Sequence, residues 1–446
     1  MNIYESVESK KSSTVVIDDF QLPIGWKIYR FRNLFKFGKG LNITKENLQD
    51  DGIPCVNYGE VHSKYGFEIN PVKHKLRCVS DYYLKKNSTS LLELGDFVFA
   101  DTSEDIEGSG NFTQLVAEVK TFAGYHTVIC RPVGDGNHRF LAYLLDSLSF
   151  RKQIRKSVKG VKVFSITKSI LKNTQVWLPD INYQIIVSAF LDKKTVQLDE
   201  AIAIKEKQIA LLKEHKQIII QKAVTQGLDP NVSMKDSGVD WIGKIPAHWE
   251  MAPGFTIFKE SKDSNKGMVE SQVLSLSYGT IIVKPKEKLV GLVPESFETY
   301  QIVEPGDVII RCTDLQNDRT SLRTGIAKNR GIITSAYLNL RVKNDAYPDY
   351  VHYFLHVLDI TKEIYRFGSG LRQNLSFADF KHMQILQPSK SEQIEIVSYI
   401  QEQEAHTINS INFLQEQIEM LKEYKNSLIN SAVTGKIKIT PEMAES

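Results

Sequence analysis

Two long stretches of the chain, residues 183–225 and 392–433, are nearly free of glycine and proline and repeat their apolar positions at helical spacing. Each stretch is therefore predicted to form one continuous α-helix. At about 1.5 Å per residue, such a helix is roughly 60 Å long. An ordinary globular core does not require helices of that length, so a further packing partner is expected.

The apolar positions of both helices follow a heptad pattern, with alternating steps of four and three residues. A narrow apolar stripe of this kind has to be buried against another helix. We expect the two helices to pair as an antiparallel coiled coil; the alternative is that each packs only on its own globular region. Lys205, Lys216 and Lys425 interrupt the stripe and favour a short or imperfect coil. The predicted interface comprises Leu198, Ile202, Ile209, Leu212 and Ile219 in the first helix and Ile411, Leu414, Ile418, Leu421 and Leu428 in the second.

The segments that precede the helices have a different pattern, in which short β-branched or aromatic runs are separated by Gly, Asn, Asp and Pro. The runs VFADT, TVIC, VIIRCT and AYLNLRV are predicted to be strands. These segments are therefore expected to be mixed α/β domains.

The chain repeats itself. Residues 211–227 match residues 420–436 at a constant shift of 209, and the same register aligns Gln184 with Gln393. Weaker matches join 94–105 to 305–318 and 24–31 to 247–255. The repeat predicts an α+β fold with pseudo-twofold symmetry, in which two mixed domains alternate with two long helices. The expected parts are a 1–20 N-terminal segment, a 21–180 first domain, a 181–226 central helix, a 227–388 linker and second domain, a 389–436 C-terminal helix and a 437–446 tail.

Composition narrows the class of protein only slightly. Of the 446 residues, 42% are apolar and 24% charged, which is typical of a folded globular protein, and the net charge is +3. The four cysteines lie far apart without a CxxC pair, so neither a zinc site nor a disulfide framework is indicated. No signal peptide and no membrane-spanning stretch is recognisable, which favours a cytoplasmic protein.

Basic residues gather in residues 150–172, which contain no acidic side chain. Such a segment suits binding to DNA phosphates, and a solvated helix face is the alternative. The eight positive charges are Arg151, Lys152, Arg155, Lys156, Lys159, Lys162, Lys168 and Lys172.

A second cluster, residues 314–331, mixes Arg with Asn and Gln after a predicted strand. Arg can read guanine and Asn or Gln can read adenine in the major groove, so this mixture suits base recognition. The corresponding loop of the first domain, residues 101–114, is acidic, and its role is left open. A Gly-rich turn within 363–380 adds Arg372 and Asn374.

A Tyr-Gly step follows a predicted strand in both domains, within residues 53–69 and 273–288. Each step is either part of a DNA-binding loop or a turn that buries its ring. Together, these segments give the candidate DNA-binding residues Asn57, Tyr58, Lys64, Tyr65, Lys156, Lys159, Lys162, Tyr278, Gln316, Asn317, Arg319, Arg323, Thr324, Lys328, Arg372 and Asn374.

Enzyme signatures are missing from the sequence. There is no GxxxxGK[ST] phosphate loop and no Asn/Asp-Pro-Pro-Tyr/Phe tetrapeptide. A nuclease motif could be assembled from Pro179, Asp180, Asp192 and Lys194, but the second copy has Gln401 in place of Asp192. No catalytic residue and no metal ligand is therefore predicted.

Two segments resemble the specificity subunits of type I restriction-modification systems. The more specific one is residues 211–250, LLKEHKQIIIQKAVTQGLDPNVSMKDSGVDWIGKIPAHWE, and the other is residues 421–437. The resemblance covers nearly the whole chain. It implies two target-recognition domains, each reading one half of a split site in double-stranded DNA. It also implies that the helix pair acts as a spacer that docks adenine methyltransferase subunits and that motor-nuclease subunits can join. S-adenosylmethionine, ATP and magnesium would belong to those partners. The alternatives are a stand-alone DNA-modifying enzyme or nuclease remnant, and a protein-interaction adaptor.

Overall fold

The computed structural model describes residues 16–17, 20–160, 162–285, 296–313, 315, 318, 321–343, 345–366 and 374–445. The chain forms two compact units. The first unit comprises Met1–Ile204 and Glu416–Ser446, and the second comprises Lys205–Gln415. Each unit thus contains one mixed domain together with part of both long helices.

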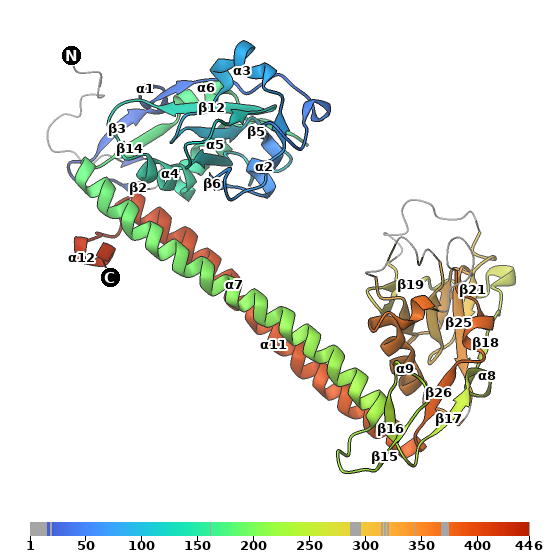
Figure 1. The fold of residues 1–446 in the computed structure, drawn as a ribbon. Helices are drawn as coiled ribbons and strands as arrows, with labels where there is room; N and C mark the ends of the chain where they lie inside the picture. The colour runs from blue at the N-terminus through green and yellow to red at the C-terminus, as the bar shows by residue number, and fades with distance from the viewer. Residues whose placement is uncertain are drawn as a thin grey trace. The chain divides into compact units, whose positions relative to one another are not determined.

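The two predicted helices are confirmed as α7 (Ile181–Gln226) and α11 (Lys390–Val433), which lie side by side (Figure 1). In the first unit, Lys425 Nζ of α11 lies 2.7 Å from a carboxylate oxygen of Asp199 in α7. In the second unit, Lys216 Nζ of α7 lies 3.3 Å from Glu404 Oε1 of α11. Residues later in α7 thus meet residues earlier in α11, so the helices run antiparallel. The α+β class with a helix pair is confirmed.

The heptad positions face inward along both helices. Ile209 and Ile418 are buried, and the other predicted interface residues are buried or half-buried. Neighbouring apolar residues outside the stripe, such as Leu211 and Phe413, are exposed. Two of the three lysines of the stripe, Lys216 and Lys425, are accommodated because each reaches a carboxylate on the other helix. The stripe is therefore an apolar seam with charged interruptions.

The first domain is built on a five-stranded sheet in the order β4-β12-β8-β10-β6, antiparallel except for the β10–β6 pair. Phenylalanines from several elements form its core, with Phe31, Phe97 and Phe112 fully buried. The sheet strands are β4 (Phe35–Phe37), β6 (Phe67–Ile69), β8 (Phe97–Ala100), β10 (Phe112–Leu115) and β12 (Thr127–Pro132). The helices are α1 (Phe31–Leu34), α2 (Tyr58–Ser63), α3 (Tyr82–Lys86), α4 (His138–Asp146), α5 (Leu148–Ser157) and α6 (Lys168–Asn173). The smaller strands are β1 (Val16–Ile17), β2 (Phe20–Gln21), β3 (Lys27–Arg30), β5 (Ile53–Val56), β7 (Cys78–Val79), β9 (Thr102–Ser103), β11 (Phe122–Ala123), β13 (Phe164–Ser165) and β14 (Gln175–Leu178).

The second domain is built on a four-stranded antiparallel sheet in the order β18-β25-β22-β23, and α9 contributes buried side chains to the same core. The sheet strands are β18 (Phe258–Glu260), β22 (Val308–Arg311), β23 (Thr324–Ile326) and β25 (Tyr337–Val342). The helices are α8 (Gly254–Ile257), α9 (Pro348–Ile360) and α10 (Phe377–Phe380), and α12 (Pro441–Glu445) follows α11 in the first unit. The smaller strands are β15 (Met234–Asp236), β16 (Lys244–Pro246), β17 (Glu250–Pro253), β19 (Leu274–Ser277), β20 (Thr280–Val283), β21 (Gln301–Val303), β24 (Gly331–Ile333) and β26 (Gln384–Gln387).

A buried salt bridge occurs at the same place in both domains. Arg131 on β12 contacts Asp96 beside β8, at 2.7 Å, and Arg341 on β25 contacts Asp307 beside β22, at 2.9 Å. Both aspartates are almost completely buried, and each also accepts a backbone N–H three residues upstream. A buried carboxylate is tolerated only when it is paired and hydrogen-bonded in this way. The match in structure supports the duplication inferred from sequence.

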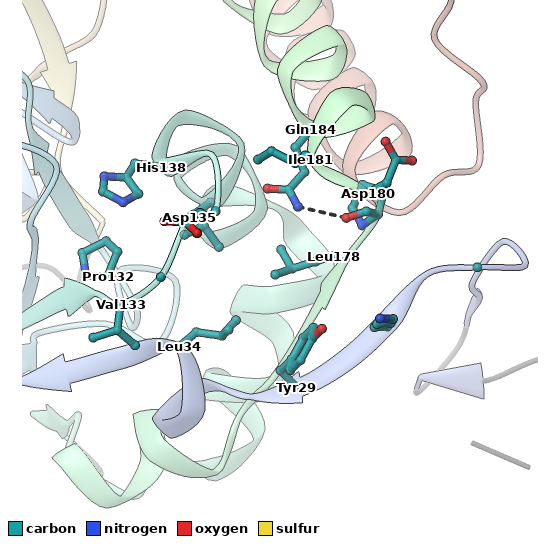
Figure 2. A pocket seen from close by; sticks show the side chains of 16 residues that line it. Tyr29, Leu34, Pro132, Val133, Asp135, His138, Leu178, Asp180, Ile181 and Gln184 are labelled. Carbon is teal, nitrogen blue, oxygen red and sulfur yellow. Dashed lines mark hydrogen bonds between the residues drawn. The ribbon is translucent and has the colours of Figure 1, made fainter. Parts of the chain in front are cut away.

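A glutamine joins each long helix to the domain that precedes it. Gln184 donates from Nε2 to the Pro179 carbonyl and accepts at Oε1 from the backbone N–H of Asn137. Gln393 makes the same pair of bonds, to Pro388 and Tyr347. Both glutamines are buried. We call this arrangement the glutamine clasp; it sets the start of each helix against the loop before α4 or α9. Figure 2 shows Gln184 beside a cavity of about 320 Å³ that Leu178 and Ile181 also line.

Each domain also holds the end of the other long helix. In the first unit, the Trp177 indole N–H donates to the Val433 carbonyl of α11, at 2.6 Å. In the second unit, the Tyr350 hydroxyl donates to the Val224 carbonyl of α7, at 3.2 Å. Carbonyls in the last turn of a helix have no hydrogen-bond partner within the helix. The Trp177 and Tyr350 side chains therefore supply hydrogen bonds that these two buried carbonyls would otherwise lack. Val224 and Val433 are themselves 209 residues apart, as the repeat predicts.

All four cysteines are free and buried. Within the part of the chain that is described, no helix combines the length and the apolar character that crossing a membrane requires.

The glutamine clasp makes a stability prediction. Gln184→Met keeps the side-chain length but leaves the Asn137 N–H and the Pro179 carbonyl without this partner. An unpaired part-buried polar group costs about 1–3 kcal/mol, so we expect the free energy of unfolding to fall by about 2 kcal/mol. Urea unfolding followed by tryptophan fluorescence measures it. Gln208→Met, at an exposed position of α7, is the control and should change stability by less than about 0.5 kcal/mol. Equal stability of the two variants would contradict the clasp.

Candidate nucleic-acid interface

The basic segment of the first domain, residues 150–172, includes most of α5, the strand β13 and most of α6. Phe150 and Ile154 are buried and attach the helix to the core, while Lys156, Lys159 and Lys162 are exposed. The positive charges are not all unopposed, contrary to the interpretation of the sequence. Arg151 pairs with Asp146 and Arg155 pairs with Glu107, so part of the charge is neutralised. Lys159 and Lys162 add exposed positive charge to this part of the domain.

The acidic loop of the first domain packs against this basic helix. Besides the Glu107–Arg155 pair at 2.8 Å, a chain of polar contacts runs from Arg151 to Asn111 at 2.5 Å and on to His62 at 3.0 Å. His62 also contacts the Thr102 carbonyl at 2.7 Å. Sequence reasoning did not find this network, because the two partners of each contact are 40 or more residues apart and no motif links them. The ion pair between Glu107 and Arg155 explains how an acidic loop can pack beside a basic helix.

The first Tyr-Gly segment lies at the start of α2. Asn57 is fully buried, and it forms a capping box with Glu60 that satisfies the first N–H groups of the helix. This burial argues against a direct contact between Asn57 and DNA. Tyr58 is half-buried against Tyr125, with ring centroids 5.6 Å apart. Lys64 is exposed at the end of the helix.

Tyr65 stacks on His74, with nearly parallel rings whose centroids are 4.5 Å apart. Its hydroxyl donates to the Lys75 carbonyl at 3.2 Å. The ring therefore has a packing role within the domain, although part of the side chain stays exposed.

In the second domain, Arg323 lies inside the domain and not on its surface. Its side chain is fully buried, and its guanidinium donates to the carbonyls of Arg311, Thr313 and Asp318. It also lies over the Tyr365 ring at 5.5 Å. The prediction of Arg323 as a DNA-binding residue does not fit this position. The residue instead bonds to Thr313 and Asp318, two described residues between β22 and β23.

Thr324 is buried in the same place. The Asp359 carboxylate accepts the backbone N–H groups of Arg323 and Thr324, and burial raises the pKa of Asp359 above its usual range. Lys328 and Asn374 are exposed and remain candidates for DNA contact. The candidates Gln316, Asn317, Arg319 and Arg372 lie outside the described residues.

Tyr278 occupies the tip of the β19–β20 hairpin, where 93% of its surface is exposed. The two Tyr-Gly steps, which the sequence treats as equivalent, thus have different structures. The first begins a helix and packs its ring, whereas the second is a two-residue turn with a projecting ring.

Two stacked histidines lie on α9 behind β23. His352 Nε2 is buried without a hydrogen-bond partner, and His356 Nδ1 lies 3.3 Å from Thr324 Oγ1. Burial, with His356 and Lys328 nearby, lowers the pKa of His352 to about 3. Burial also lowers the pKa of His356 to about 4; Lys216 and Lys362 act in the same direction, and Glu404 opposes them. No cluster of metal-ligating side chains occurs among the described residues.

These histidines predict a loss of stability in acid. Their pKa values in the folded chain lie below the unfolded value of about 6.5, so the folded state favours the neutral form. The stabilising effect is complete above about pH 6.5 and is lost as the pH falls below it, by about 1–2 kcal/mol per histidine at pH 5. Urea unfolding at pH 7.5 and pH 5 should show a smaller difference for His352→Phe than for the wild type. His406→Phe, on an exposed face of α11, should behave as the wild type. An unchanged pH dependence in His352→Phe would refute this assignment.

The fold and its surfaces together define a class of protein, namely a duplicated scaffold in which two mixed domains are each attached to an antiparallel helix pair. Loops on the domains carry basic and aromatic side chains, and the two copies share their buried polar contacts but not their loops.

Comparison with known proteins agrees with this class. Residues 23–214 match the family described as Type I restriction modification DNA specificity domain. The Type I restriction enzyme MjaVIII specificity subunit of Methanocaldococcus jannaschii is 23% identical over 316 residues, covering 67% of this chain and 70% of that protein. The same fold occurs in a solved chain whose title describes complex assembly and conformational transition of the type I R-M system. It aligns with a TM-score of 0.67 at 16% identity, covering 94% of this chain and 100% of that one. The HsdS subunit from Thermoanaerobacter tengcongensis aligns with a TM-score of 0.49 at 15% identity, covering 94% of this chain and 99% of that one.

The chain thus resembles the specificity subunits of type I restriction-modification systems, and residues 23–214 match the DNA specificity domain of that family.

Proposed function

We propose that this chain recognises a split site in double-stranded DNA, with the first domain reading one half and the second domain the other. The observation that carries this proposal is the structural duplication, in which the same clasp and the same buried Asp-Arg pair support two domains with different loops. Equivalent scaffolds with unlike loops suit two half-sites of unlike sequence. We place the protein in the cytoplasm, in keeping with its four free cysteines.

We infer that the chain is not itself an enzyme. The aspartates of the possible nuclease motif have structural roles, since Asp180 accepts the Tyr183 N–H at the start of α7 and Asp192 accepts from Arg139 and Tyr143. S-adenosylmethionine, ATP and magnesium would act in partner subunits. Cleavage or methylation of DNA by the purified chain with magnesium and S-adenosylmethionine would favour a stand-alone enzyme instead.

The helix pair offers docking surfaces for the methyltransferase subunits. On α7, Ile204, Leu211 and Ile218 are exposed at intervals of seven residues, which places them on one helix face. On α11, Phe413 and Met420 are exposed 209 residues after the first two. Leu211, Ile218 and Phe413 border a groove of about 840 Å³. A duplicated apolar strip suits two copies of one partner, and motor-nuclease subunits would join the resulting assembly.

If Lys159 and Lys162 bind DNA phosphates, their removal should change how the affinity for DNA depends on salt. Replacing both Lys159 and Lys162 by Ala should weaken binding to duplexes of any sequence. It should also lower the slope of log affinity against log salt by up to about 2, because each phosphate contact contributes about 0.9. Fluorescence anisotropy between 50 and 250 mM KCl measures this slope. Lys213→Ala, exposed on α7, is the control. An unchanged slope would remove these two lysines from the interface.

If the helix pair sets the distance between half-sites, its length should determine the spacer. Deleting residues 205–211 and 411–417 removes one heptad at facing positions and preserves the phase of the seam. Each helix loses about 10 Å, so the preferred spacer should shorten by about three base pairs at 3.4 Å each. Methylation mapping with the cognate methyltransferase reads the site directly. The half-site sequences should stay the same, and an unchanged spacer would rule out the ruler role.

A further inference from the structure

The β19–β20 hairpin of the second domain ends in an unusual turn. Ser277 pairs with Thr280, which leaves Tyr278 and Gly279 as a two-residue connection. Both central residues have positive φ, 48° for Tyr278 and 78° for Gly279, the pattern of a type I′ turn. Asn-Gly is the preferred sequence for this turn, because residues other than Gly, Asn and Asp adopt positive φ at a cost.

Folding does not explain a tyrosine at this position. The ring is 93% exposed, so it contributes almost no packing. Its backbone conformation is one that asparagine or glycine would adopt more readily. The unfavourable backbone conformation of Tyr278 is therefore the observation that points to a role outside folding.

The tip is held firmly against the rest of the domain. A Cβ added to Gly279 would lie 3.0 Å from Leu322 Cδ1, just before β23. A Cβ added to Gly325, within β23, would lie 2.8 Å from Leu276 Cδ1 and 3.2 Å from the Gly279 carbonyl oxygen. The hairpin therefore packs closely on β23 and on Leu322 just before it, so Tyr278 projects from a supported hairpin.

We propose that the β19–β20 hairpin enters the major groove and that Tyr278 reads one base step of the second half-site through apolar contact with base edges, favouring thymine. The major groove admits a two-stranded ribbon, and the thymine 5-methyl group is the apolar feature exposed there. This inference rests on the proposed DNA-recognition function and deepens it. The first domain has no counterpart at its aligned tyrosine, because Tyr58 begins a helix and packs on Tyr125.

Three variants of the full chain, assembled with its methyltransferase partner, test the proposal. Tyr278→Phe keeps the ring and should bind the cognate duplex within about twofold of the wild type. Tyr278→Ala and Tyr278→Asn remove the ring and should bind about 10- to 100-fold more weakly, the range for losing the burial of one aromatic side chain. Tyr278→Asn creates an Asn-Gly turn, so its thermal unfolding midpoint should equal or exceed that of the wild type. Weak binding by this variant therefore cannot be attributed to misfolding.

The preference for thymine is tested by exchanging each thymine of the second half-site for uracil, which deletes only the methyl group. One exchange should weaken binding of the wild type and of Tyr278→Phe, and should have no effect on Tyr278→Ala. Tyr82→Ala, which removes an exposed tyrosine of the first domain, should leave preferences in the second half-site unchanged.

A wild type that selects a split site while Tyr278→Asn binds it equally well would overturn this inference alone. A wild type without sequence preference would overturn the proposed function as well.

Discussion

The apolar seam between α7 and α11 is the constraint on which the rest of the molecule depends. Neither helix, at 46 and 44 residues, can bury a stripe of this length against its own small domain. Pairing the helices in antiparallel fashion buries the stripe, and the ion pairs at Lys216 and Lys425 accommodate its charged positions. As a consequence, the end of each helix meets the domain that starts the other, where Trp177 and Tyr350 satisfy the Val433 and Val224 carbonyls.

The duplication divides the chain into a repeated framework and two different surfaces. The glutamine clasp and the buried Asp-Arg pair recur at matching positions, because each domain is attached to the start of a long helix in the same way. Loops outside this framework are under no such constraint. In one domain the Tyr-Gly step begins a helix, and in the other it turns a hairpin.

Much of the framework could be predicted from the sequence. Heptad spacing located both helices, and the 209-residue shift paired Gln184 with Gln393 before their common role was visible. The candidate interface was harder to predict, because residue type does not reveal which way a side chain points. Asn57 and Arg323 have the chemistry of base readers, yet both are buried, one capping a helix and the other donating to backbone carbonyls. Pairing of Arg155 with Glu107, across 48 residues, likewise has no local signal.

The central claim is that two domains on one helix pair read two separate halves of a DNA site. Selection of duplexes from a random library by the full chain, assembled with its methyltransferase partner, tests it most directly. The account predicts two constant blocks of unlike sequence, separated by a stretch of constant length and random composition. A single uninterrupted block, or enrichment without any sequence preference, would contradict it.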